Sequence, residues 1–316
     1  MTTKINPSVA TKIAKTETKA KQAWLEERKT YIGATDAGAI CGVNPYQTPH
    51  DVWLAKKGLV QDETNIAMRH GTYIETFIAQ EFQAKTGHKV YKSKTYRHKD
   101  HQWAACNPDR ELRINGEFGL LECKSVGYFA SKNFGQDGAD QIPQHYAIQI
   151  MWQLIVTGAK FVILAALVDN RELRTFTYTL DPNLSATAHV FPPELVQSVV
   201  RRCKKFWEFN VLGDNEPELS GHDSDTEWMQ KERASYENGQ LTNTDQETDR
   251  LCVRLERAIQ RKKRAEFAEA ETKNRIKRFM AEREASELES SVGIFTFKTN
   301  VKGIATFKTP FVSNKA

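Results

Sequence analysis

The sequence has few cysteines, no long apolar run and no strong excess of either charge. No two of its five cysteines form a CxxC pair, since they stand singly at Cys41, Cys106, Cys123, Cys203 and Cys252. Neither a zinc ribbon nor a disulfide framework is therefore indicated, and reduced thiols are expected. The chain carries 45 basic and 40 acidic residues, a net charge of +5. This modest excess permits a polyanionic partner without requiring one.

The longest apolar run, FVILAALV at residues 161–168, is too short to span a bilayer. Residues 1–22 also lack the apolar segment of a secretory signal peptide, so we expect a cytoplasmic protein. With 316 residues, of which 40% are hydrophobic, the chain is long enough for one large domain with an appendage, or for two domains.

Helix signals dominate the first ninety residues. A small-residue segment is expected to begin a helix at a cap formed by Thr35 or Asp36. A second helix is expected to start at Thr48 and to end at Gly58. A third is expected to end at Gly87, and its periodicity predicts an apolar face that contains Tyr73, Phe77, Ile78 and Phe82.

Patterns of period two follow and predict strands. Residues 89–99 have the pattern of one strand, and residues 102–112 that of a strand broken at Pro108. Residues 118–126 predict a strand entered through the turn at Asn115-Gly116. The rest of this region predicts a helix, a hairpin through an Asp-Asn turn and a further helix, which correspond to residues 142–158, 160–180 and 193–213.

This order of elements predicts an α/β (α+β) fold, in which a central mixed sheet is flanked by helices. We expect a flexible basic arm at residues 1–22, a folded core at 23–212, and a polar linker with little structure of its own at 213–248. Residues 249–316 are expected to form a helical extension that ends in a β-hairpin.

Two acids and a lysine lie around one predicted hairpin. Asp109 follows Pro108 at the strand break, and Glu122 and Lys124 lie in the segment LLECKS of the next strand. Because side chains alternate along a strand, Glu122 and Lys124 point to the same face. If the strands are antiparallel neighbours, Asp109 and Glu122 converge on a site that suits Mg²⁺. A glutamate and lysine at this spacing are more often a solvated strand face, so the assignment depends on the rest of the sequence.

The segments HGTYIE, CNPDRE, LLECKS and YAIQIMWQL occur in this order, after RKTYIGATDAGAICGVNPYQTPHDVWLAKKG. Together they resemble the YqaJ-like viral recombinase family, the phage exonucleases related to lambda exonuclease within the PD-(D/E)xK nuclease superfamily. The resemblance covers residues 24–210 and implies a restriction-endonuclease-like fold. No single motif is decisive, but the combination in this order is specific.

The resemblance also implies the roles of individual residues. Asp109 and Glu122 match the metal-binding carboxylates, and the carbonyl of Cys123 matches a further ligand. Lys124 matches the catalytic lysine, and Glu75 matches the acid that a helix contributes to the site.

Further matched positions lie on the flanking helices. Gln149 matches a glutamine near the attacking water, and Tyr146 and Gln153 lie on neighbouring turns in supporting positions. Arg28 and Thr35 are similar to the pair that holds the DNA 5′-phosphate. The family usually has serine where Thr35 stands, and the hydroxyl is retained.

The resemblance implies processive 5′ to 3′ digestion of linear duplex DNA by a site that holds two Mg²⁺ ions, or Mn²⁺ in their place.

The product would be 3′ single-stranded tails for a strand-annealing protein of phage-type recombination. The resemblance further implies a homo-oligomer, a trimeric ring through which DNA passes, encoded by a phage or prophage and active in a bacterial cytoplasm.

Two alternatives stay open at the level of the sequence. The first is an AddB-like nuclease, which holds an iron–sulfur cluster and needs four cysteines, three of them close together. The second is a DNA-binding or annealing module without catalysis. Basic residues of the N-terminal arm and of a later cluster, Arg261 to Arg264, would carry that function, although each run is also typical of a solvated face.

Overall fold

The computed structural model describes residues 23–60, 66–184, 187–233, 245–300 and 302–310. The chain divides into two compact units, Met1–Tyr236 and Glu237–Ala316. The basic arm that the sequence predicts at residues 1–22 lies outside the described residues. Within the described part of the chain, no helix is both long and apolar enough to cross a membrane.

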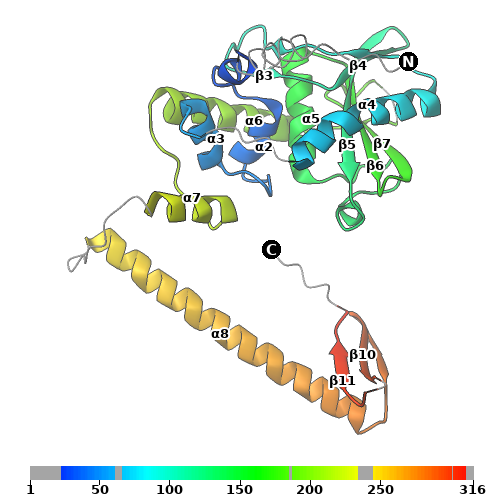
Figure 1. Cartoon of the computed structure of the whole chain (residues 1–316), viewed down its shortest axis with the longest axis vertical. Helices are drawn as coiled ribbons and strands as arrows, with labels where there is room; N and C mark the ends of the chain where they lie inside the picture. Colours follow the sequence, from blue (N-terminus) through cyan, green and yellow to red (C-terminus); the bar gives the residue numbers. More distant parts are fainter. Residues whose placement is uncertain (1–22, 61–65, 185–186, 234–244, 301, 311–316) are drawn as a thin grey trace, which may run out of the picture. The chain divides into compact units, whose positions relative to one another are not determined.

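A six-stranded mixed sheet forms the centre of the first unit, in the order β1-β4-β5-β6-β7-β8 (Figure 1). Strand β5 runs parallel to β6, and β7 runs parallel to β8, whereas the other neighbours are antiparallel. The strands are β1 Val90–Lys92, β4 Arg110–Ile114, β5 Glu117–Val126, β6 Phe161–Val168, β7 Glu172–Thr179 and β8 His189–Val190.

Helices cover both faces of this sheet (Figure 1). Helix α4 (Ile66–Thr86) places Ile78 and Phe82 in the same buried cluster as Leu121 of β5. Helix α5 (Gln144–Thr157) connects β5 to β6 and lies on the other face, where its residues share a cluster with Leu120. All eight residues of β6 are buried between the two layers. The predicted mixed sheet flanked by helices is confirmed.

Local capping chemistry defines the two helices that precede α4. Thr48 caps α3 (Pro49–Lys57) by accepting from the backbone N–H of Asp51, and Gly58 ends it in the left-handed conformation with φ of 70°. Both predicted caps of α3 are therefore confirmed. For α2 (Ala34–Ile40), the cap is Gly33, whose N–H donates to the carboxylate of Asp36 at 2.8 Å. The predicted cap at Thr35 or Asp36 was wrong, because Asp36 acts from the third helical position.

The apolar face of α4 differs from the prediction. Ile78 and Phe82 are buried, but Tyr73 is 81% and Phe77 45% exposed. The position that joins Ile78 and Phe82 on the core face is Ile74. Tyr73 and Phe77 each precede a core residue by one position, which rotates them by about 100° around the helix.

Residues 89–99 form two strands instead of the single predicted one. Strand β1 pairs with β4, whereas β2 (Tyr96–Arg97) pairs with β3 (Ala105–Cys106) in a separate two-stranded sheet. The chain changes partner between β1 and β2, a change that alternation of side chains does not reveal. The predicted break at Pro108 is confirmed, because it separates β3 from β4.

Two turns form as their residue types predict. Asn115 and Gly116 adopt positive φ values of 52° and 84° between β4 and β5. Asp169 and Asn170 adopt 49° and 55° between β6 and β7. Asparagine, aspartate and glycine tolerate this conformation best. The predicted later helix is α6 (Pro193–Lys205), which continues into a π-helical segment, Phe206–Leu212.

The segment 213–248 contains more structure than its composition indicates. Helix α7 (Asp223–Arg233) lies within it and belongs to the first unit. The expectation of a linker with little structure is therefore wrong for this part of the segment.

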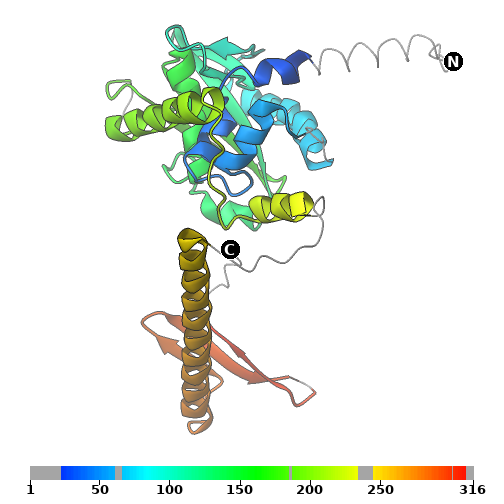
Figure 2. The ribbon, with the colours of Figure 1, turned by 90° about the vertical axis from the view of Figure 1, so that its left-hand side faces the viewer.

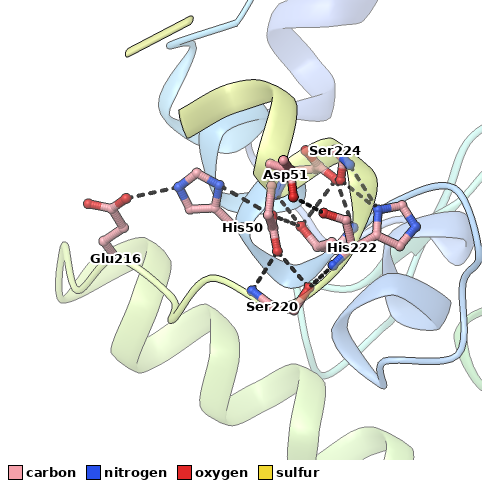
Figure 3. A network of polar contacts seen from close by, with 9 residues as sticks. His50, Asp51, Glu216, Ser220, His222 and Ser224 are labelled. Carbon is pink, nitrogen blue, oxygen red and sulfur yellow. Dashed lines mark hydrogen bonds and ion pairs between the residues drawn. The ribbon is translucent and has the colours of Figure 1, made fainter. Parts of the chain in front are cut away.

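A polar network attaches the start of α7 to α3 (Figure 3). The buried carboxylate of Asp225 accepts from the hydroxyl of Thr48 at 2.8 Å. It also accepts from the N–H and the hydroxyl of Ser220, at 2.7 Å and 2.6 Å. The hydroxyl of Ser224 donates to Asp51 at 2.7 Å. The attachment is thus polar and depends on residues far apart in the sequence.

The second unit consists of one long helix and a small sheet (Figure 2). Helix α8 (Gln246–Ala281) is continuous over 36 residues, and β9 (Glu287–Ser290), β10 (Gly293–Thr299) and β11 (Ala305–Lys308) form an antiparallel sheet. Met280 and Phe295 are its buried apolar residues within the described part. The predicted helical extension and terminal hairpin are confirmed, and β9 adds a third strand.

Candidate active site

The site begins where β4 separates from β5. The two strands are antiparallel neighbours whose last pair on this side is Arg110 with Leu121. By continuation of this register, Asp109 lies opposite Glu122. The Asp109 carboxylate accepts from the N–H of Cys123 at 2.7 Å, and so satisfies a backbone donor that β4 no longer pairs. Because β4 and β5 no longer pair beyond this point, there is room for acid side chains beside β5.

Glu122 is the most thoroughly bound side chain of the site. It is 2% exposed, and its Oε1 accepts from the Lys124 ammonium at 2.6 Å and from Gln149 at 2.5 Å. Its Oε2 accepts from Gln153 at 2.6 Å. Helix α5 therefore supplies two amide donors that fix both oxygens of one carboxylate. Bonds to an ionised group are strong and hold the side chain in one orientation.

The pKa values of Asp109 and Glu75 are both raised in this site. Burial, together with the nearby Glu122, raises the pKa of Asp109 well above its ordinary value. Burial and Glu122 likewise raise the pKa of Glu75 on α4, and Lys124 partly offsets this rise. Glu122 of β5 is thus close enough to raise the pKa of the acids on α4 and at the start of β4.

Lys124 is the cation at the centre of this group. Burial lowers its pKa, but the carboxylates of Glu122 and Asp109 outweigh this effect and raise it. Its ammonium lies 5.1 Å from the ring centroid of Tyr146 on α5, within the range of a cation–π contact. The lysine is therefore held in its charged form.

His145 lies beside this lysine. Burial and the Lys124 charge lower the pKa of His145 to about 4, so the imidazole is neutral at physiological pH. Its ring contacts Tyr146 and, edge-on, the exposed Tyr46. A neutral imidazole can accept a proton. The sequence places His145 near the predicted site, but a lone histidine is more often structural, so we assign it no role as a general base.

The residues present fit a hard divalent cation. Asp109 and Glu122 offer carboxylate oxygens, the ligands that Mg²⁺ prefers, and the raised pKa of Asp109 indicates excess negative charge that a cation would relieve. Within the described residues, no group of three or more His, Cys, Asp or Glu side chains is arranged to hold a metal ion. The predicted set differs from such a group, because it combines two carboxylates with the main-chain carbonyl of Cys123.

Arg28 and Thr35 lie on either side of Gly33, the cap of α2. Thr35 is exposed, and the Arg28 guanidinium lies 3.7 Å from the buried Asp36. Burial raises the pKa of Asp36, but Lys56 and Arg28 outweigh this effect and lower it. Lys56 contacts Asp36 at 2.6 Å and donates to the carbonyl of Arg28 at 2.9 Å.

The sequence analysis missed the role of Asp36 and Lys56 as the residues that position Arg28. The sequence shows Lys56 only as a lysine in the last turn of α3, and a lysine at such a position is usually solvated. Its ammonium is instead buried against an acid twenty residues away. Helix α2 also packs closely on α5, since a Cβ at Gly38 would lie 3.5 Å from the carbonyl of His145. This contact places α2 beside the N-terminal turn of α5, which carries Tyr146.

The fold and the site together consist of a mixed sheet between helices, with carboxylates and a lysine gathered at β5. Residues 23–160 match the model of the YqaJ-like viral recombinase domain, which confirms the resemblance found in the sequence. The chain is also 29% identical over 231 residues to the uncharacterized protein YqaJ of Bacillus subtilis, an alignment that covers 72% of this chain and 67% of YqaJ.

Two solved structures are similar over about two thirds of the chain. LHK-Exo, an alkaline exonuclease from Laribacter hongkongensis in complex with dAMP, is 15% identical with a TM-score of 0.46, covering 67% of this chain and 98% of LHK-Exo. A putative exonuclease from Eubacterium rectale is 12% identical with a TM-score of 0.43, covering 69% of this chain and 93% of the other.

Proposed function

We propose that this protein is a divalent-metal-dependent exonuclease that hydrolyses linear duplex DNA. The observation that carries the proposal is the cluster at the end of β5. Glu75, Asp109 and Glu122 converge there around Lys124, and the pKa of Asp109 is raised by burial and by Glu122. Such a concentration of buried acids costs stability, and binding of a cation and a phosphate is a function that accounts for it.

Asp109, Glu122 and the carbonyl of Cys123 would hold Mg²⁺, or Mn²⁺ in its place. A bound ion supplies polarisation of the phosphodiester and a lowered pKa of water. Lys124 would offset the negative charge that develops on the phosphate, once its contact with Glu122 is shared with the substrate. Gln149 and Gln153 would keep Glu122 in its orientation. A second ion of the family type would need Glu75 as a ligand.

We further propose that digestion runs 5′ to 3′ from a phosphorylated end. The supporting observation is Arg28, whose side chain is 33% exposed and is held beside α2 by Asp36 and Lys56. A guanidinium offers a planar fork of donors to phosphate, and the exposed hydroxyl of Thr35 adds a donor. Asp36 lies closer to Lys56, at 2.6 Å, than to Arg28, at 3.7 Å, so the three groups together keep one net positive charge for the phosphate.

The tails left by such an enzyme would be 3′ single strands, the substrate of a strand-annealing protein. A closed ring, expected to be a trimer, would keep the enzyme on one strand through many cleavages. Such a ring requires each subunit to offer two different complementary patches. The ring rests on the family resemblance alone.

The iron–sulfur alternative gains no support from the arrangement of the cysteines. Cys106, Cys123, Cys203 and Cys252 belong to β3, β5, α6 and α8, and Cys41 ends α2. The module without catalysis would need no buried acid cluster, which is why we favour the enzyme.

Digestion of a linear duplex, labelled separately at its 5′ and 3′ ends, tests the proposal. With Mg²⁺ we expect early release of the 5′ label and no release in EDTA. Arg28→Ala should reduce the preference for 5′-phosphorylated over 5′-hydroxyl ends, whereas Arg113→Ala, an exposed arginine of β4, should not. Early release of the 3′ label would contradict the polarity, and equal rates with EDTA would contradict the metal requirement.

A further inference from the structure

Five arginines form a continuous stripe along the first half of α8: Arg250, Arg254, Arg257, Arg261 and Arg264. Their spacings are four, three, four and three residues. At 100° per residue the five stay within roughly 80° of arc, and at 1.5 Å per residue they extend over about 21 Å. All five are exposed. We call this set the arginine stripe.

The positive charge of the arginine stripe is not compensated by its own helix. None of its members forms an ion pair with another residue that the structure describes. The second half of α8 behaves differently: Lys273 pairs with Glu269 at 2.5 Å and Arg278 with Glu282 at 2.8 Å. Both halves contain acids, so the difference lies in their placement. Glu247 and Asp249 flank the start of the stripe, whereas Glu256 and Glu266 occupy other faces of the helix.

The stripe is also not covered by its own unit. Along the described length of α8, Met280 is the buried residue, near the C-terminal end where the small sheet packs. The helix also leaves Leu251, Leu255 and Ile259 exposed, and at 100° per residue these lie on other faces than the stripe. A groove of about 600 Å³ lies among four of the stripe's arginines, with Asp249 as the acid on its wall. No residue of the acid cluster at β5 lines that groove.

The chemistry of the stripe suits phosphate. The stripe consists of arginines, whereas Lys262 and Lys263 lie on other faces of the helix. A guanidinium presents a rigid, planar fork that matches phosphate oxygens, and it is less strongly hydrated than an ammonium. A duplex carries one negative charge per about 1.7 Å of its axis, so a stretch of duplex as long as the stripe, about 21 Å, carries roughly twelve phosphate charges on its two strands.

We propose that the arginine stripe of α8 binds the sugar–phosphate backbone of duplex DNA. The stripe lies outside residues 23–160, the part that matches the family domain. The inference rests on the proposed function for its choice of duplex DNA, the substrate of that reaction. Contacts to the backbone alone are independent of base sequence and sensitive to salt. The stripe would therefore hold the substrate without selecting its sequence.

Binding of the full chain to a blunt duplex in EDTA tests the stripe without requiring hydrolysis. The variant Arg254→Gln/Arg257→Gln/Arg261→Gln removes three members of the stripe. Its matched control, Lys262→Gln/Lys263→Gln/Lys273→Gln, removes the same charge from other faces of α8. Glutamine has nearly the helix propensity of arginine and lysine, so circular dichroism should give equal helix content for both. Fluorescence anisotropy across a range of salt concentrations gives the affinity and its salt dependence.

We expect the stripe variant to bind about 10- to 100-fold more weakly at 0.1 M salt. The slope of log affinity against log salt should fall by about 2.7, or 0.9 for each of three phosphates, and the control should change it by less than about 1. Equal losses in both variants, no loss in either, or a loss confined to single-stranded DNA would overturn the proposal. A stripe variant that changes only sedimentation would overturn it too, and would assign the stripe to a contact between copies.

The outcome is separable from that of the proposed function. If the chain releases no nucleotides from duplex DNA but the stripe variant binds weakly, the nuclease proposal fails and the stripe stands. If the stripe variant binds as the wild type does while hydrolysis proceeds, the stripe proposal fails and the nuclease stands.

Discussion

The acid cluster at β5 and the arginine stripe on α8 use charge in opposite ways. In the cluster, the acid Glu122 and the cation Lys124 are largely buried and bound to each other at 2.6 Å. On α8, five like charges are exposed and lack ion pairs within the described residues. The cluster can exist only after β4, β5, α4 and α5 have assembled, whereas the stripe needs only the period of one helix. The catalytic site that we propose therefore requires the whole fold, whereas the surface that we propose for binding a polyanion requires one helix.

The two regions also differ in their cost. Burial and Glu122 raise the pKa of Asp109 and of Glu75, so the ionised forms of these two acids cost stability. Exposed arginines on a helix cost little, because water solvates them. Substitutions in the cluster should therefore change catalysis by orders of magnitude and can raise stability, whereas substitutions on the stripe should change affinity and leave stability nearly constant.

The largest effect is expected at the cation of the cluster. Lys124→Met should reduce the rate of nucleotide release about 10²- to 10³-fold, the usual effect of removing one group that stabilises charge in a transition state. Lys99→Met, an exposed lysine, serves as the control and should leave the rate unchanged. A Lys124→Met enzyme within a factor of three of wild type would place the reacting phosphate elsewhere.

A smaller loss is expected where α5 fixes Glu122. Gln149→Leu removes the donor at 2.5 Å from Oε1, so metal affinity and rate should fall about 10- to 100-fold. The comparison is Gln144→Leu, an exposed position at the start of the same helix. Titration of Mg²⁺ against initial rate separates the two effects. Equal Mg²⁺ dependence in all three proteins would show that Gln149 does not position the carboxylate.

The polar network of α7 should contribute to stability instead of catalysis. Asp225→Asn weakens a buried acceptor that binds Thr48 and Ser220 and should lower the free energy of unfolding by about 1–3 kcal/mol. Burial raises the pKa of Asp225, but the bonds from Ser220 and Thr48 lower it overall. The stabilisation is therefore present at neutral pH and is lost as pH falls through the lowered pKa.

Urea unfolding at pH 7 and at pH 3 checks this prediction, with Asp223→Asn as the exposed control on the same helix. The difference between wild type and Asp225→Asn should shrink at the lower pH. A constant difference at both values would mean that the charge of Asp225 does not contribute.

The smallest effect is a gain of stability in the cluster. The raised pKa of Asp109 means that its charged form is disfavoured in the metal-free fold. Its contribution is most favourable below the ordinary pKa of aspartate and is lost as pH rises through the raised value. Asp109→Asn should therefore raise the melting temperature in EDTA at pH 8, and the gain should disappear at low pH. Added Mg²⁺ should raise the melting temperature of wild type but not of Asp109→Asn. A variant that melts below wild type at pH 8 would contradict the electrostatic account.

Local chemistry explains which parts of the fold the sequence predicted. Thr48 and Gly58 define α3 through contacts within one turn, and Asn115-Gly116 forms its turn because both residues tolerate positive φ. The strand position of Glu122 and Lys124 likewise follows from alternation. These features depend on neighbours in the chain, so the pattern of the chain contains them.

Contacts between distant residues explain what the sequence did not predict. Helix α7 attaches through Asp225 and Thr48, which are 177 positions apart, and the short polar segment around it shows no apolar period. The burial of Lys56 against Asp36 depends on the way α3 packs on α2. The predicted apolar face of α4 included Tyr73, which adjoins the core position Ile74. A step of one residue along the helix moves a side chain from the buried face to the exposed one.

The most direct test of the central claim is nucleotide release from linear duplex DNA by the full chain in Mg²⁺, compared with Glu122→Gln. Glutamine keeps the size of the side chain and removes the charge that the cation needs. Glu117→Gln, an exposed acid at the start of the same strand, is the matched control. We predict release by wild type and by Glu117→Gln, and a loss of about 10³-fold in Glu122→Gln. Release by Glu122→Gln at the wild-type rate would contradict the assignment of the cluster as the catalytic centre.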